Sequence, residues 1–191
     1  MNNTLQLARR GIHAVDHVGL WIGLLSLRLI LAWEYGEAGF EKLHGSNWFA
    51  DIQDQFPWPF KLIPADFNWA LATGFEIVGA IALVIGLGTR FFSASLIVLT
   101  VVAMLSVHWP ESWSSLSELL KGYALTNDGF GNFKLPVIYM TMLVPLVLMG
   151  PGRLSFDAWL CKRWAIRADA KSGAYSERPL STHHFNSAGE A

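Results

Sequence analysis

Residues 17–42 read HVGLWIGLLSLRLILAWEYGEAGFEK, and this stretch decides how the rest of the chain is interpreted. It is mostly apolar and, at about two dozen residues, is long enough to cross a bilayer as a helix. It nevertheless contains five charged residues, which are Arg28, Glu34, Glu37, Glu41 and Lys42. A charge at the bilayer centre costs on the order of 3 kcal/mol on insertion scales. We therefore expect these side chains to face polar partners inside a helix bundle.

Composition around this stretch indicates an integral membrane protein in contact with a lipid bilayer. Hydrophobic residues make up 52% of the 191, charged residues only 15%, and the mean hydropathy is +0.34. A soluble domain usually carries about 25% charge. The net charge of −1 gives no sign of a nucleic-acid partner. The single cysteine, Cys161, excludes an intrachain disulfide and a CxxC redox pair.

Four apolar runs predict the fold class, an all-α membrane protein with a bundle of four transmembrane helices. The runs lie at roughly 17–40, 66–88, 91–108 and 134–150. We interpret the first as an uncleaved membrane helix, because it is too long for a signal peptide and no small-residue cleavage site follows it.

Basic residues set the expected orientation of the bundle. They precede the first run, occupy the tight connection between the second and third, and follow the fourth. The positive-inside rule then places both termini in the cytoplasm, for a multi-pass protein of a bacterial inner membrane. We expect a cytoplasmic N-terminus at 1–16, a membrane domain at 17–160, and a polar, disordered cytoplasmic tail at 161–191.

The two longer loops would then face the periplasm, and both are rich in aromatic residues. The first, at roughly 43–65, contains Trp48, Phe49, Phe56, Trp58 and Phe60. The second contains Trp113, Leu116, Leu120 and Tyr123, whose spacing places them on one helical face. We expect short interfacial helices in both loops. They either anchor the protein at the membrane surface or form a lid over a cavity between the helices.

Helix geometry predicts a buried polar network of Arg28, Glu34, Glu37 and Glu76. Arg28 lies near the middle of the first run and Glu76 near the middle of the antiparallel second run, so the two should share a depth and pair. Such a pair either only joins two helices or also serves a function. Glu34 and Glu37 share one helical face with Glu41, which should climb toward the outer surface.

An outer vestibule is predicted where that face ends, formed by Glu41, Lys42, His108 and Lys134. It would bind a cation, a proton or a polar substrate; the alternative is a solvated helix end. Met104 and His108 lie four residues apart, a spacing that places a thioether and an imidazole on one helical face. These ligands suit Cu(I), although methionine in a membrane helix also serves packing. No residue is identified as catalytic.

Several stretches resemble the DoxX-like integral membrane proteins over roughly 17–160. They are RLILA at 28–32, GFEKL at 39–43, FEIVGAIALVIGLGTR at 75–90 and GPGRLSFD at 150–157. Further stretches resemble the HvfX-type subgroup: NWFADI at 47–52, FPWPFKLIPAD at 56–66, LTVVAMLSVHWPESW at 99–113 and GFGNFKLP at 129–136.

The subgroup resemblance implies a role in the maturation of copper-binding peptides that are made ribosomally and then modified. The chain would be a non-enzymatic inner-membrane accessory whose partners are a copper-binding peptide and its maturation enzymes. The wider family also implies an alternative, a subunit that uses a membrane quinone in thiosulfate or thiol oxidation. Against an enzyme, the chain has no CxxC, flavin motif or haem ligand set. A third alternative is small-solute transport, for which four helices would need to form a homo-oligomer.

Overall fold

The computed structural model describes residues 2–110, 112–123 and 131–164, and within these ranges the chain is helical with connecting turns and has no β-strand. The elements are α1 (Asn2–His44), η1 (Phe49–Gln55), η2 (Phe60–Leu62), α2 (Ala65–Ile85), α3 (Thr89–Ala103), η3 (Met104–His108), α4 (Leu116–Lys121) and α5 (Lys134–Met149). The chain divides into two units, 1–158 and 159–191. In the second unit, residues 159–164 are helical and the Arg163 guanidinium lies 4.3 Å from the Trp159 ring centroid. The prediction of a disordered tail falls mostly on residues outside the described ranges.

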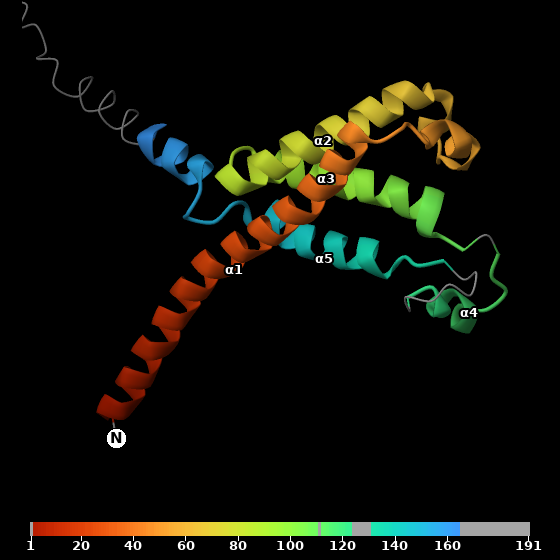
Figure 1. Cartoon of the computed structure of the whole chain (residues 1–191). Coiled ribbons are helices and arrows are strands. Elements are labelled where there is room, and N and C mark those ends of the chain that lie inside the picture. Colours follow the sequence, from red (N-terminus) through yellow and green to blue (C-terminus); the bar gives the residue numbers. More distant parts are fainter. Residues whose placement is uncertain (1, 111, 124–130, 165–191) are drawn as a thin grey trace, which may run out of the picture. The chain divides into compact units, whose positions relative to one another are not determined.

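The four apolar runs all form helices, and three of them match their predicted bounds closely. The exception is α1, which already begins at Asn2, so the polar N-terminal segment is helical as well. Figure 1 shows this first part of α1 extending beyond the other helices of the unit. Short helices are also present in both long loops, η1 and η2 in the first and α4 in the second.

Two helical segments among the described residues are long and apolar enough to cross a membrane by length and composition. They are α2, with 21 residues, and the continuous segment Thr89–His108, in which α3 continues directly into the π-helical η3. A third helix, α5, is apolar but shorter, at 16 residues. The all-helical class is thus confirmed, while the count of four spans stays a prediction.

The core lies where α1 crosses α2 and where α3 packs on α5 (Figure 1). Its fully buried side chains are mostly leucines, Leu31, Leu83, Leu96, Leu143 and Leu146. Small residues let the helices approach closely, as is common in membrane bundles. A Cβ built on Gly79 would lie 3.2 Å from Leu96, and one built on Gly39 would lie 2.8 Å from Ile77.

Candidate functional site

The buried guanidinium of Arg28 binds backbone carbonyls, and it does not pair with Glu76. Its Nε donates to Leu83 O at 2.7 Å and its Nη2 to Val84 O at 2.9 Å. Its Nη1 donates to Pro151 O and Leu154 O, at 2.9 and 2.8 Å. The last carbonyls of a helix have no intrahelical donor, so Arg28 satisfies the C-terminal end of α2 and the segment after α5 together.

The same end of the bundle is closed by an aspartate. The Asp157 carboxylate accepts the backbone N–H groups of Gly88 and Thr89, at 2.9 and 3.1 Å, and so caps the N-terminus of α3. Its own N–H donates to Gly86 O at 3.0 Å. The turn between α2 and α3 is thereby fixed to the segment after α5, and Arg28 belongs to this closed structural end.

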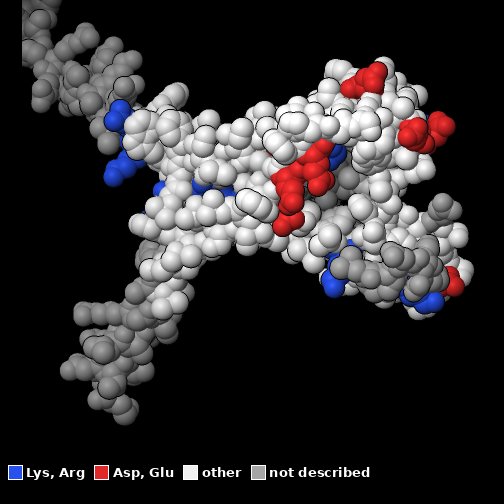
Figure 2. Space-filling model, viewed as in Figure 1, with Lys and Arg blue, Asp and Glu red and all other residues white. Residues whose placement is uncertain are grey.

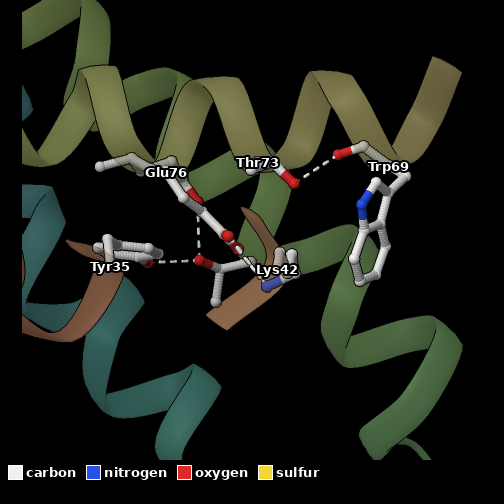
Figure 3. A network of polar contacts seen from close by, with 7 residues as sticks. Tyr35, Lys42, Trp69, Thr73 and Glu76 are labelled. Atoms are coloured by element: carbon white, nitrogen blue, oxygen red, sulfur yellow. Dashed lines mark hydrogen bonds and ion pairs between the residues drawn. The ribbon is translucent and has the colours of Figure 1, made fainter. Parts of the chain in front are cut away.

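Glu76 instead forms an ion pair with Lys42, from which both of its carboxylate oxygens lie 2.9 Å away. Glu76 is 3% exposed and Lys42 is also largely buried. Figure 3 shows Lys42 of α1 reaching across to Glu76 of α2. Nearer the start of α2, the Thr73 hydroxyl donates a hydrogen bond to the Trp69 carbonyl. The predicted Arg28–Glu76 pair is therefore wrong.

The register of α1 against α2 explains the error. Gly39 packs directly on Glu76 and Ile77, whereas Arg28 reaches the residues at the far end of α2. The prediction placed the helix midpoints opposite each other. In the structure α1 is displaced along α2 so that its last turns lie against the middle of α2. The loop from 45 to 64 then leads back to the start of α2.

A cavity of about 490 Å³ lies beside this ion pair, between the first half of α2 and the second half of α3. Lys42 and Glu76 line it together with Asn68 and His108, and the other lining side chains are almost all apolar. Ligand sites typically occupy about 300–1,000 Å³, with mostly apolar walls and a few placed polar groups. The cavity thus has the size and composition of a binding site for a small amphipathic molecule.

Aromatic residues of the first long loop cover the cavity. Its walls include Trp48, Phe49, Phe56 and Phe60 from the segment that contains η1 and η2. Phe49 and Phe56 are buried, with ring centroids 5.1 Å apart, and Phe49 also packs edge-on against Trp69 of α2. These residues line a cavity between the helices, and the alternative in which the loop acts as a lid stays a prediction. Trp58 is 75% exposed and does not take part.

The predicted vestibule residues are brought together only in part. Lys42 and His108 line the cavity, but Glu41 is exposed on α1 and the Lys134 ammonium lies 5.7 Å from the Tyr123 ring centroid. His108 Nδ1 contacts the Asn132 side-chain oxygen, and Asn132 N–H donates to the His108 carbonyl. These two contacts join the end of η3 to the residues just before α5.

The proposed metal pair of Met104 and His108 stays a prediction. Only His108 of the two lines the cavity, and both belong to the π-helical η3. Across residues 2–110, 112–123 and 131–164, no three His, Cys, Asp or Glu side chains are grouped in a way that could hold a metal ion.

Glu34, Glu37 and Glu41 share a face of α1, and Figure 2 shows acidic side chains gathered over that part of the molecule. Glu37 is exposed, so its predicted place in a buried polar network is wrong. Glu34 accepts a 2.5 Å hydrogen bond from the Tyr139 hydroxyl of α5. Sequence reasoning missed Tyr139 and also the Tyr35 hydroxyl, which contacts Thr100 Oγ1 of α3 at 2.5 Å. A tyrosine in an apolar run gives no sign of its partner, because the register between helices decides it.

Comparison with known proteins gives a family match over part of the chain. Residues 23–109 match the sequence profile of the DoxX family. A protein of Haemophilus influenzae (strain ATCC 51907 / DSM 11121 / KW20 / Rd), described as an uncharacterized protein, is 43% identical over 151 residues. That alignment covers 79% of this chain and 91% of the relative. No solved structure matches the chain.

Proposed function

Because the chain belongs to the DoxX family of membrane-associated proteins, we propose that it is a membrane-embedded accessory protein in the handling of a copper-binding modified peptide. In this proposal it spans the bacterial inner membrane four times with both termini in the cytoplasm. The cavity beside Lys42 and Glu76 is its working site, and separate enzymes modify the peptide.

The observation that carries the proposal is where the HvfX-like stretches lie. Those at 47–52 and 56–66 supply the aromatic lining of the cavity, and the one at 99–113 supplies most of its α3 and η3 wall. The stretch at 129–136 contains Asn132, the partner of His108. Three of the four stretches thus line one cavity, and the fourth contacts a residue of its lining. This supports a role for the cavity in what that subgroup does.

A complementation experiment tests the proposal with a matched pair of variants. Ala72 lines the cavity, whereas Ala70, on the same helix, is exposed and does not. We expect Ala72→Phe to fill the cavity and abolish rescue of copper tolerance, and of the modified peptide's mass, in a deletion strain. Ala70→Phe should rescue fully. Full rescue by Ala72→Phe at equal membrane level would refute the proposal.

A second candidate function, a quinone-linked oxidoreductase subunit, is favoured by one feature of the same cavity. Its walls are mostly apolar, and its charged group is an internally neutral ion pair between Lys42 of α1 and Glu76 of α2, a helix that is long and apolar enough to span a membrane. Such a site fits a quinone ring better than a free ion. When bound, a quinone would supply two-electron redox chemistry, and Lys42 would donate a hydrogen bond to its carbonyl.

Extraction in mild detergent, followed by quinone and metal analysis, separates the two candidates. If the chain is a quinone-linked subunit, we expect about one quinone per protein to co-purify with the wild type. Ala72→Phe should lose this bound quinone, and Ala70→Phe should keep it. Absence of quinone from the wild-type protein, together with copper-dependent complementation, would leave the accessory role.

A further inference from the structure

We propose that the cavity takes a single-chain amphipathic molecule dissolved in the bilayer, which enters sideways between α2 and α3 with an apolar chain and a hydrogen-bond-accepting oxygen head group. This inference rests on the proposed function only in using the same cavity. It concerns which class of ligand the cavity accepts and the route by which that ligand arrives.

The route follows from the exposure of the lining residues. Three of them, Leu71 of α2, Val98 of α3 and Val107 of η3, are 36%, 53% and 47% exposed, so they line the cavity and also reach the outer surface. They belong to the two segments that are long and apolar enough to span a membrane. A mouth framed by such residues opens toward lipid, because exposed apolar side chains on a spanning helix face acyl chains.

The contact between α2 and α3 is tight on one side of the cavity. Between the turn and the cavity, a Cβ built on Gly79 would lie 3.2 Å from Leu96, so the two helices leave no gap there. Farther along, the aromatic rings of the 49–60 segment line the cavity between the two helices. Because these rings cover the far end, a water-soluble peptide or ion would have to displace them, whereas a lipid-dissolved molecule would not.

The polar end of the cavity defines the head group. Lys42 has three N–H donors, and the two oxygens of Glu76 engage two of them. The third is left for a ligand, and the ion pair is neutral overall. A head group with an acceptor oxygen, such as a carboxylate or a ring carbonyl, would complete the ammonium's hydrogen bonds. The apolar walls would hold the attached chain.

Photolabelling of the full-length protein in nanodiscs of phosphatidylethanolamine and phosphatidylglycerol tests the proposal. The probe is a long-chain carboxylic acid with a diazirine in its chain, and a headless hydrocarbon of equal length is its control. We expect the acid to label peptides that contain Phe75 and Leu99, and the hydrocarbon to label them at least about tenfold less. Competition by unlabelled oleate or by an unlabelled prenyl quinone shows which acceptor-headed lipid the cavity prefers.

Two variants separate entry from head-group recognition. Val98→Trp should block the mouth and lower labelling about tenfold, while Val78→Trp should not. Val78 is a 51% exposed valine of α2 that does not line the cavity. The neutral double variant Lys42→Met/Glu76→Gln avoids a lone buried charge and should weaken acid labelling about tenfold, as for loss of one charged hydrogen bond.

The proposal would be overturned if the acid and the hydrocarbon labelled the cavity equally and the double variant left labelling by the acid unchanged. The cavity would then admit lipid chains without recognising a head group. Absence of label from the cavity walls would overturn it as well. The proposed function fails separately. If Val98→Trp loses the label but still rescues copper tolerance, the ligand assignment stands, and the proposal that this cavity is the working site for copper handling is refuted. If the cavity walls of the wild-type protein are unlabelled but Ala72→Phe still abolishes rescue, the ligand assignment fails and the proposed function stands.

Discussion

The two buried charged sites of this bundle solve the same physical problem in opposite ways. At one end, Arg28 is surrounded by four backbone carbonyls, all within 2.9 Å, and is 1% exposed. Toward the other end, Lys42 and Glu76 neutralise each other beside a cavity of about 490 Å³. The first site uses the donors of one side chain to join three segments. The second leaves a donor and an open space.

The difference shows how a structural charge can be told from a functional one. A guanidinium that is 1% exposed and donates four of its five N–H groups to backbone carbonyls of two other segments serves to stabilise the fold. An ion pair of two flexible groups at a cavity wall is a costly way to join helices, since apolar residues of similar volume often serve as well. Buried charges of this bundle are therefore best judged by whether they line a cavity, as Lys42 and Glu76 do and Arg28 does not.

The largest effect is expected at the closed end, from Arg28→Leu. The change leaves four carbonyls without donors, each at a cost of about 1–3 kcal/mol, so the free energy of unfolding should fall by more than about 4 kcal/mol. Membrane level and the apparent Tm in detergent should both drop sharply. A second change, Glu76→Leu, should not restore them. Recovery in that double variant would show that the two residues interact after all.

A smaller effect is expected from Lys42→Met, which leaves the Glu76 carboxylate buried without a cation. Removing one partner of a buried pair typically costs about 3–5 kcal/mol, and uptake of a proton by Glu76 should reduce that loss here. Adding Glu76→Gln should recover most of the apparent Tm, while labelling by the long-chain acid stays about tenfold weaker than in the wild type. If the double variant were as unstable as Lys42→Met alone, the pair would be structural like Arg28.

Gly86→Ala should destabilise the closed end by an intermediate amount, about 1–3 kcal/mol. Gly86 has φ +73°, and a Cβ there would lie 2.6 Å from the Ser155 Cβ and 2.7 Å from Arg28 Nη2. Gly74 of α2 provides the control, because a Cβ there meets nothing within 4 Å. Gly74→Ala should leave the apparent Tm unchanged or raise it. An equal loss in both variants would mean that the contact with Arg28 is unimportant.

Sequence reasoning predicted the helices and the identity of the charged residues, but not their partners. Apolar runs and terminating glycines locate α2, α3 and α5, because hydrophobic length and turn chemistry are local properties. Pairing depends on the register between helices, and the displacement of α1 along α2 moves Arg28 past Glu76 to the end of that helix. No local pattern encodes that displacement.

The cavity could be predicted only in outline. Prolines and aromatic rings marked the first long loop as more than a linker, and four of those rings do line the cavity. Lys134 was grouped with Lys42 by depth alone, yet it lies over the Tyr123 ring. Depth along a helix constrains one coordinate of a side chain, and the direction in which it points needs the packed structure.

The smallest effect concerns a charge outside the bundle, Glu118 of α4, which serves as a reference for the two buried sites. Hydrogen bonds from the Ser114 hydroxyl, at 2.6 Å, and from the Ser114 N–H, at 2.9 Å, hold the pKa of this carboxyl below its ordinary value. Since the folded pKa lies below the unfolded one, its contribution to the helix start is complete above the unfolded pKa. It is lost as the pH falls through the folded value.

In an NMR titration of the protein in detergent, Ser114→Ala should raise the titration midpoint of the Glu118 carboxyl toward its ordinary value. The midpoint should not reach that value, because the hydrogen bond from the backbone N–H of residue 114 remains. An unchanged midpoint would show that water, and not Ser114, sets the ionisation of this exposed group.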